Sequence, residues 1–200
     1  MRAKTTLTLG VLALALCGQA LAGAFEDATT AYMRGDYAGA MKMIQPLADQ
    51  GDVRAQFNLG MMNYNGQGVP RNHEEAAKWF RMAAERGDVE SQRRLGFMYA
   101  NGQGVARDDR EAVKWYGRAA EQGDADAQVN LGVMYSAARG TSQDYVQAHK
   151  WFSVAASRYP ASERDKRQQA VKNGERLAAK MTPGQIAEAQ RLAREWQPKT

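Results

Sequence analysis

A 36-residue period is the feature that most constrains how this 200-residue chain can fold. The first two copies agree at 20 of 36 positions, and one tryptophan recurs at the same place in every copy. The copies cover residues 51–86, 87–122 and 123–158, and the tryptophans are Trp79, Trp115 and Trp151. Repeats of this length are typical of proteins that stack small supersecondary units. The period therefore predicts a solenoid, and it names no reaction.

Each copy contains two predicted helices, which we call its first and second helix. An aspartate after a glycine opens the first helix as an N-cap, and an apolar stripe at spacings of three and four follows it. The second helix opens with a capping-box spacing and carries a face of alanines and aromatic residues. The N-caps of the first helices are Asp52, Asp88 and Asp124, and those of the second are Asn72, Asp108 and Asp144.

A glycine recurs inside each predicted first helix, at Gly60, Gly96 and Gly132. Glycine inside a helix costs about 1 kcal/mol relative to alanine. Its recurrence predicts that the second helix crosses closely at this point. The large aromatic residues of the second helix are expected in the core, because large apolar side chains on a helical period usually pack inward.

Two flanking segments are expected to close the array. Residues 24–50 read as a shorter helical hairpin that caps the N-terminal end, because terminal repeats are usually atypical. Residues 162–197 read as two capping helices. Ser162 with Asp165 is expected to begin the first of these helices, whose seam includes Val171, and Thr182 with Pro183 to begin the second.

Residues 1–22 have the pattern of an export signal. Arg2 and Lys4 precede ten mainly apolar residues, 7–16, and Ala20-Leu21-Ala22 resembles a cleavage site. Ten residues are too few to span a bilayer, which needs about 20. We expect cleavage after Ala22 and a periplasmic or secreted protein. A retained anchor, or lipidation at Cys17, is the alternative.

Charge is distributed unevenly along the chain. Residues 23–160 carry sixteen Lys and Arg against seventeen Asp and Glu, whereas residues 161–200 carry nine against five. The basic C-terminal segment would permit weak contact with an anionic surface. Because its charges alternate with acids, a solvated face is the simpler interpretation. Nucleic acid is not expected as a partner of an exported chain.

The repeated motif resembles the Sel1-like repeat, a relative of the tetratricopeptide repeat with a longer internal loop. The second copy carries the match most fully, through Leu95, Gly96, Met98, Tyr99, Gly102, Gly104, Val105, Ala112, Trp115, Ala119 and Ala120. Asn63 and Ala138 depart from it, and Ala138 replaces the first loop glycine of the third copy. The resemblance implies an all-α, right-handed α-solenoid of helix-turn-helix repeats with a C-terminal helical cap. It also implies an adaptor that binds proteins in a concave groove.

If the first helices line that groove, residues off their apolar stripe would face the partner. These positions vary between copies, and several are large and apolar, as recognition surfaces often are. The leading candidates are Arg54, Phe57, Met61, Tyr64, Arg93 and Phe97, and the remaining ones are Glu90, Ala100, Asp126, Val129, Val133 and Ser136. The alternative is that the same side chains pack between neighbouring helices.

The sequence offers no enzyme motif, and we predict no catalytic, metal-binding or cofactor-binding residue. His73 and His149, the two histidines, lack ligand partners at metal-site spacing and are expected to be ordinary exposed residues. The glycine loops lack the lysine and hydroxyl residue of a phosphate loop. Paired acids such as Glu74 and Glu75 lie at helix starts, where the helix dipole favours them.

These observations predict a monomeric, non-enzymatic scaffold that binds a protein or peptide ligand in the bacterial envelope. Two alternatives remain open. One is an enzyme that binds or hydrolyses β-lactams, as cysteine-rich Sel1-like proteins do, although the expected mature chain has no cysteine. The other is an envelope assembly accessory or a toxin-neutralising protein.

Overall fold

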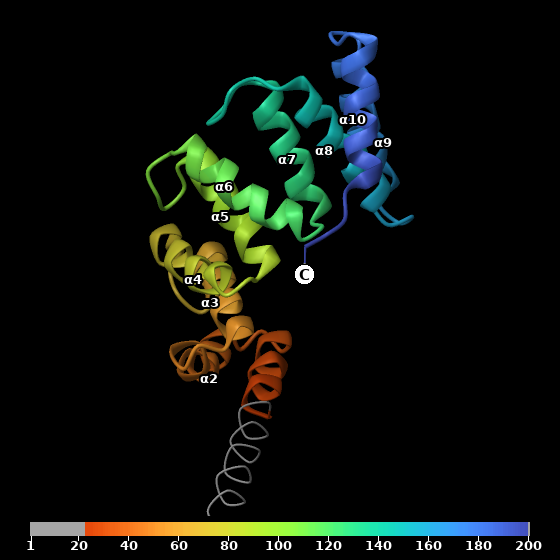
Figure 1. Cartoon of the computed structure of the whole chain (residues 1–200). Helices are drawn as coiled ribbons and strands as arrows, with labels where there is room; N and C mark the ends of the chain where they lie inside the picture. Colours follow the sequence, from red (N-terminus) through yellow and green to blue (C-terminus); the bar gives the residue numbers. More distant parts are fainter. Residues whose placement is uncertain (1–22, 200) are drawn as a thin grey trace, which may run out of the picture. The chain divides into compact units, whose positions relative to one another are not determined.

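The computed structural model describes residues 23–199, and all regular secondary structure in that range is helical (Figure 1). Residues 23–33 form a helix that precedes α2. The helices that follow are α2 (Tyr37–Asp49), α3 (Val53–Asn65), α4 (His73–Glu85), α5 (Val89–Asn101), α6 (Asp109–Glu121), α7 (Ala125–Ser136), α8 (Tyr145–Arg158), α9 (Arg164–Ala178) and α10 (Pro183–Glu195). Helices that are consecutive in sequence pack in pairs, so the predicted all-α solenoid fold is confirmed.

The chain divides into two compact units between Met82 and Ala83. Unit 1 has its core between the helix at 23–33, α2 and α3, with Trp79 packed against it. Unit 2 contains α5 to α10, and its largest cluster joins α6, α7 and α8. The pairs α5 with α6 and α7 with α8 are the first and second helices of two successive copies.

The first helix of each copy begins where the sequence predicts. The carboxylates of Asp52, Asp88 and Asp124 accept the backbone N–H three residues later, at 2.6–3.0 Å. Each bond satisfies an N–H that the helix leaves without a partner. The predicted N-caps of these helices are therefore confirmed.

The long loop of each copy is held by two repeated backbone hydrogen bonds. In the first copy Gln67 donates to Met62 and Asn72 donates to Asn63, and equivalent bonds recur 36 and 72 residues later. The bonds enclose a residue with left-handed backbone, which is glycine in two copies. Gly66 has φ of 74° and Gly102 has φ of 67°, and Ala138 takes the same conformation with φ of 53°. The third loop thus keeps the shape of the others without the glycine.

The second helices have only half of the predicted capping box. Asn72, Asp108 and Asp144 do accept an N–H from the first turn. Their own N–H groups are already bonded to a carbonyl near the end of the preceding helix, so the glutamates are not needed there. Glu75 instead pairs with Lys78, and Glu111 pairs with Lys114 and accepts from the Trp115 indole.

The internal glycines accommodate an aromatic ring of the second helix. A Cβ atom at Gly60 would lie 2.6 Å from the Phe80 ring, and one at Gly96 would lie 2.8 Å from Tyr116. Gly132 has the same relation to Phe152. The predicted close crossing is confirmed, and a ring lying on the first helix is its cause.

The repeated tryptophans are not equally buried. Trp115 and Trp151 are buried as predicted, whereas Trp79 is half-buried. The ring of Trp151 meets Trp196 edge to face, with 6.0 Å between centroids. Trp196, which directly follows α10, thereby attaches the end of the chain to α8.

The C-terminal helices α9 and α10 both pack against α8 (Figure 1). Thr182 and Gln185 make both bonds of a capping box at the start of α10, as predicted. The predicted start of α9 was wrong by one residue: Glu163 is the N-cap, and its side chain makes no capping bond. Val171 was also misplaced in the seam of α9, because it is exposed and Gly174 lies on the buried side instead.

No helix within residues 23–199 is both long and apolar enough to cross a membrane. The predicted export signal, its cleavage site and Cys17 lie outside the described residues.

Candidate functional site

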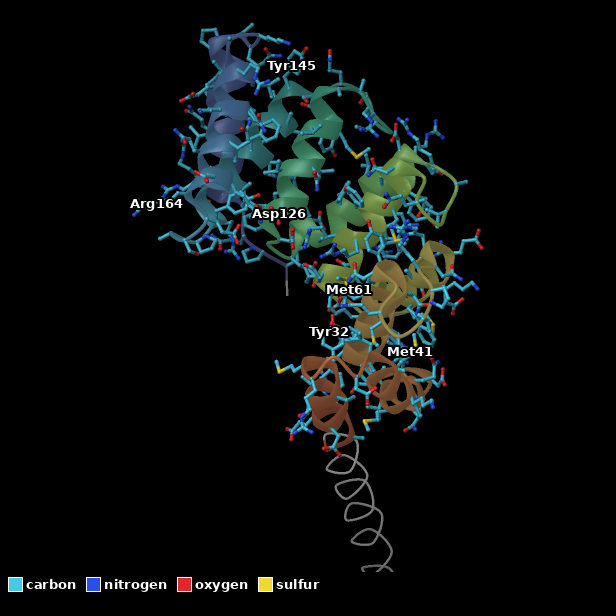
Figure 2. The ribbon with its side chains drawn as sticks, turned by 180° about the vertical axis from the view of Figure 1, so that it is seen from behind. Tyr32, Met41, Met61, Asp126, Tyr145 and Arg164 are labelled. Atoms are coloured by element: carbon cyan, nitrogen blue, oxygen red, sulfur yellow. The ribbon has the colours of Figure 1, made fainter. Side chains whose placement is uncertain are left out.

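Unit 1 contains an apolar pocket between the helix at 23–33, α2 and α3, which we call the N-terminal pocket. Its volume is about 210 Å³. It is lined by Phe25, Ala28, Thr29, Tyr32, Ala40, Ile44, Asn58, Met61 and Met62. Figure 2 labels Tyr32 and Met61, which come from neighbouring helices of this unit. One predicted groove residue, Met61, thus lies in the wall of a pocket.

Arg54, a second predicted groove residue, borders the N-terminal pocket. Its guanidinium lies over the Phe25 ring, 4.4 Å from the centroid, and 3.2 Å from a carboxylate oxygen of Asp52. Its side chain remains 62% exposed. Burial opposes ionisation of Asp52, but the bonds from Arg54 and the Ala55 N–H outweigh it and lower the pKa of the carboxyl. The pocket therefore has a cation available beside its aromatic wall.

Phe57 and Tyr64, two further candidates, contact the second helix of their own copy. The rings of Phe57 and Phe80 are 6.0 Å apart, and Tyr64 lies edge-on to His73 at 4.7 Å. Both side chains are half-buried. These contacts agree with packing between helices, and their role in a groove stays a prediction.

In unit 2, Arg93 is the centre of a network of charges on α5 and α7. It pairs with Glu90 on its own helix, and its Nε lies 3.2 Å from Asp124 without hydrogen-bond geometry. Asp126 lies at 4.0 Å. Burial raises the pKa of Asp124, and the Ala127 N–H and Arg93 oppose this change. The acids that surround Arg93 compensate its charge.

The network continues from α7 to α9 through Asp126. This carboxylate accepts hydrogen bonds from the Tyr159 hydroxyl at 2.7 Å and from Lys166 at 3.1 Å. Burial opposes its ionisation, but these two bonds prevail and lower its pKa. The first turns of α5, α7 and α9 are thus joined by paired charges, and these acids and bases nearly balance at the N-terminal ends of the three helices.

Phe97, the last of the leading candidates, is 42% exposed on α5. Val133 occupies the equivalent position of the next copy, on α7, and is 39% exposed. Unit 2 therefore presents large apolar side chains to solvent at one repeat position, as the groove hypothesis expects. Exposure makes these residues available for contact but does not identify a ligand.

The histidines differ from the expectation of exposed residues. His149 is buried, with 8% exposed, and its Nδ1 lies 3.3 Å from the Ser153 hydroxyl. Burial lowers the pKa of its ring. The prediction was wrong because α9 and α10 both pack on α8, and His149 lines a cavity with Gly174 of α9 and Ile186 of α10. Within residues 23–199, no three His, Cys, Asp or Glu side chains gather closely enough to hold a metal ion.

A repeated buried glutamine was missed in the sequence. Gln56, Gln92 and Gln128 each donate from Nε2 to the backbone carbonyl eight residues earlier, at 3.0–3.1 Å. That carbonyl lies in the last turn of the second helix of the preceding copy or, for Gln56, in the last turn of α2. The sequence signal that could have found it is a glutamine that recurs every 36 residues, next to positions of the apolar stripe. The function of this residue is to join helix pairs.

Comparison with known proteins places this architecture among bacterial repeat proteins. The Sel1 repeat model matches residues 53–88, 89–124 and 125–159. The crystal structure of c5321, a protective antigen of uropathogenic Escherichia coli strains displaying an SLR fold, is 35% identical and has a TM-score of 0.68. The similarity covers 78% of this chain and 32% of that one, so this chain spans about a third of the E. coli protein.

Two further structures are similar. A Sel1 repeat protein from Oxalobacter formigenes is 29% identical with a TM-score of 0.64, covering 84% of this chain and 73% of that one. Cysteine rich protein B of Helicobacter pylori is 23% identical with a TM-score of 0.47, covering 69% of this chain and 92% of that one. No curated protein matches the sequence.

Proposed function

Because this chain belongs to the Sel1 repeat family, we propose that it is a non-enzymatic scaffold that binds a protein or peptide of the bacterial envelope. Its repeats are scaffold modules. The export pattern of residues 1–22 supports a periplasmic or secreted location. A monomer with no cofactor is part of the proposal.

The observation that carries this proposal is the N-terminal pocket. Tyr32 is 37% exposed at its edge, and Met61 and Phe25 give it an apolar wall. Ligand pockets for small molecules usually have volumes of about 300–1,000 Å³. A volume of about 210 Å³ suits a single apolar side chain of a larger partner better than a whole metabolite. Arg54 would add a contact to a polar or acidic neighbour of that side chain.

Photo-crosslinking tests this function in living cells. A photoreactive amino acid replaces Met61 in the full chain, and a matched variant carries it at Glu74, an exposed residue of α4. We expect discrete adducts with an envelope protein from position 61 and none from position 74. The mass of the adduct should include a chain that begins at Gly23. The proposal fails if both positions give the same adducts, or if position 61 gives none.

A further inference from the structure

A second depression lies in unit 2 between the C-terminal halves of α7 and α9, and we call it the α7–α9 groove. Its volume is about 290 Å³. It is lined by Val133, Ser136, Tyr145, Phe152, Asn173, Arg176, Leu177 and Lys180. Tyr145, at the start of α8, is labelled in Figure 2, well separated from Asp126 at the start of α7. The groove and the Asp126 network therefore lie at opposite ends of α7 and α9.

The floor of the groove is apolar. Phe152 and Leu177 are buried members of one cluster, and Tyr145 packs against them. Val133 rises at the rim, where it is partly exposed. The whole groove, at about 290 Å³, lies at the lower limit of small-molecule pockets and has room for one aliphatic side chain. It therefore fits a protein segment that crosses the surface and inserts one residue.

The wall of the groove carries two cations and no carboxylate. Arg176 donates to the amide oxygen of Asn173 at 3.0 Å, and that oxygen also accepts from Gln169. The partner of Arg176 is therefore a neutral amide, and most of the five N–H donors of its guanidinium remain available to a ligand. Within residues 23–199, neither Arg176 nor Lys180 has a carboxylate within ion-pair distance. Both side chains belong to exposed residues.

The opposite end of the same helices is arranged differently. Lys166, in the first turn of α9, pairs with both Asp126 and Glu163. Arg93 on α5 is similarly surrounded by acids. Charge is therefore compensated at the N-terminal ends of these helices and left positive at the groove. An anionic partner complements the uncompensated end.

The spacing of the two cations indicates the form of that partner. Arg176 lies in the last turn of α9, and Lys180 lies in the tight turn that follows the helix end at Ala178, where its N–H bonds to Leu177. A rise of about 1.5–2.0 Å per residue over these four residues gives about 6–8 Å between the two positions. Side chains two residues apart on an extended strand are separated by about 6.6 Å and lie on the same side. Two carboxylates in the pattern acid-x-acid would therefore match both cations at once. A preceding aliphatic residue on the same side would reach the apolar floor.

We infer that the α7–α9 groove binds an extended acidic segment of a partner protein, with an aliphatic residue in the floor and two carboxylates on Arg176 and Lys180. The inference rests on the proposed scaffold function and adds the chemistry of the ligand. The acids are internal side chains of the segment, because the two cations are distributed along the wall instead of converging on a single terminal carboxylate.

Fluorescence anisotropy with the chain from residue 23 to 200 tests the inference. The probe is a labelled peptide, acetylated and amidated, with the sequence Gly-Leu-Ser-Glu-Ser-Glu-Gly, and its control has Gln in place of both Glu. We expect the acidic probe to bind at least ten-fold more tightly, with affinity that falls as salt rises. Arg176→Gln with Lys180→Gln should abolish this preference.

A matched variant separates the groove from general charge. Arg167→Gln with Lys172→Gln removes the same two residue types from α9 outside the groove, and it should retain the preference. Val133→Ser, at a partly exposed position, should weaken the probe with Leu but not one with Ala at that position. Cations near a helix C-terminus also stabilise the helix, so circular dichroism is the control for loss of structure. Unchanged helicity in a variant assigns its loss of binding to the groove.

Several outcomes would overturn the inference. These are equal binding of the Glu and Gln probes, equal loss in both double variants, or no binding at about 1 mM protein, beyond the range of specific recognition. Tighter binding of a probe with a free C-terminal carboxylate and no Glu would assign the groove to chain ends and also reject it. If the peptide probes show no preference while position 61 still gives adducts, only this inference is rejected. If position 61 gives no adducts, the proposed scaffold function is rejected.

Discussion

At the scale of the residue, the third loop shows which part of the repeated motif the fold requires. The backbone after helix α7 takes a left-handed conformation at Ala138, where the other two loops have glycine. A residue with a Cβ pays about 1–2 kcal/mol for that conformation. The loop keeps it because Arg139 donates a backbone bond to Met134 and places its guanidinium on Asp109. The surroundings thus impose a conformation that alanine does not favour.

Replacing Ala138 by glycine should stabilise the protein. Relief of the strain exceeds the extra unfolded-state entropy of glycine, which is about 0.4–1 kcal/mol. We expect a gain of about 0.5–1 kcal/mol in the free energy of unfolding, measured by urea denaturation. Ala137→Gly is the control, because φ at Ala137 is −100° and glycine brings no relief there. A loss of stability in Ala138→Gly would contradict this account of the loop.

His149 should make stability depend on pH. Burial lowers the pKa of its ring in the folded protein, whereas the unfolded value is about 6.5. As pH falls through that unfolded value, the unfolded chain binds a proton that the folded chain does not, so stability decreases. Below the folded pKa the loss becomes constant. Glu175 of α9 is the carboxylate that lines the same cavity as His149.

Thermal unfolding between pH 7.5 and 5 measures this effect. The midpoint of the unmodified chain should fall as pH decreases, and His149→Gln should flatten the curve. His73→Gln serves as the control and should leave the slope in place, since it retains His149. Equal slopes in the unmodified chain and His149→Gln would mean that His149 does not cause the dependence.

At the scale of the element, neighbouring helix pairs are joined by amides as well as by apolar contact. Each buried glutamine binds the end of the helix that precedes its own, so a polar bond crosses every junction between consecutive copies. Gln92 differs from Gln128 because its Oε1 also accepts a hydrogen bond from Gln122 at 2.8 Å. The Oε1 of Gln128 is buried with no partner.

This difference predicts unequal effects of the same substitution. Gln92→Leu removes two hydrogen bonds and leaves the Gln122 amide without its partner, so it should cost about 1–3 kcal/mol. Gln128→Leu removes one bond and also an unsatisfied oxygen, so its cost should be at least about 1 kcal/mol smaller. Chemical denaturation of both variants gives the comparison. A larger cost for Gln128→Leu would contradict it.

At the scale of the whole chain, the last repeat depends on the two helices that follow it. Phe152 packs with Leu177 of α9, and Trp151 meets Trp196 beyond α10. Lys199 adds a backbone bond and an ion pair to Glu121. A solenoid needs such a terminal cap because its last unit would otherwise expose an apolar face.

A chain that ends at residue 160 should therefore aggregate. Removal of α9 and α10 would expose the faces of Phe152 and Trp151, and light scattering coupled to size exclusion should show large species. The chain from residue 23 to 197 is the control, because it keeps both helices and loses only the last contacts. A monodisperse, fully helical protein ending at residue 160 would show that the cap is dispensable.

The sequence by itself determined the repeated architecture. Aspartates after glycines placed the N-caps, because a cap acts within the first helical turn. The 36-residue period placed the helix pairs, because each copy forms one two-helix unit. It also indicated which positions vary on a constant scaffold, among them Met61 and Phe97. These are local patterns, and their physical causes are capping and helical amphipathicity.

Only the tertiary structure decided which polar and apolar residues meet across helices. Met61 joins a pocket with residues of the helix at 23–33 and α2, His149 is covered by α9, and Arg93 is compensated by acids of α7. Each of these environments depends on side chains distant in sequence. Burial and charge compensation depend on every side chain that lies nearby in space. A repeat period predicts the course of the backbone but not which side chains meet across helices.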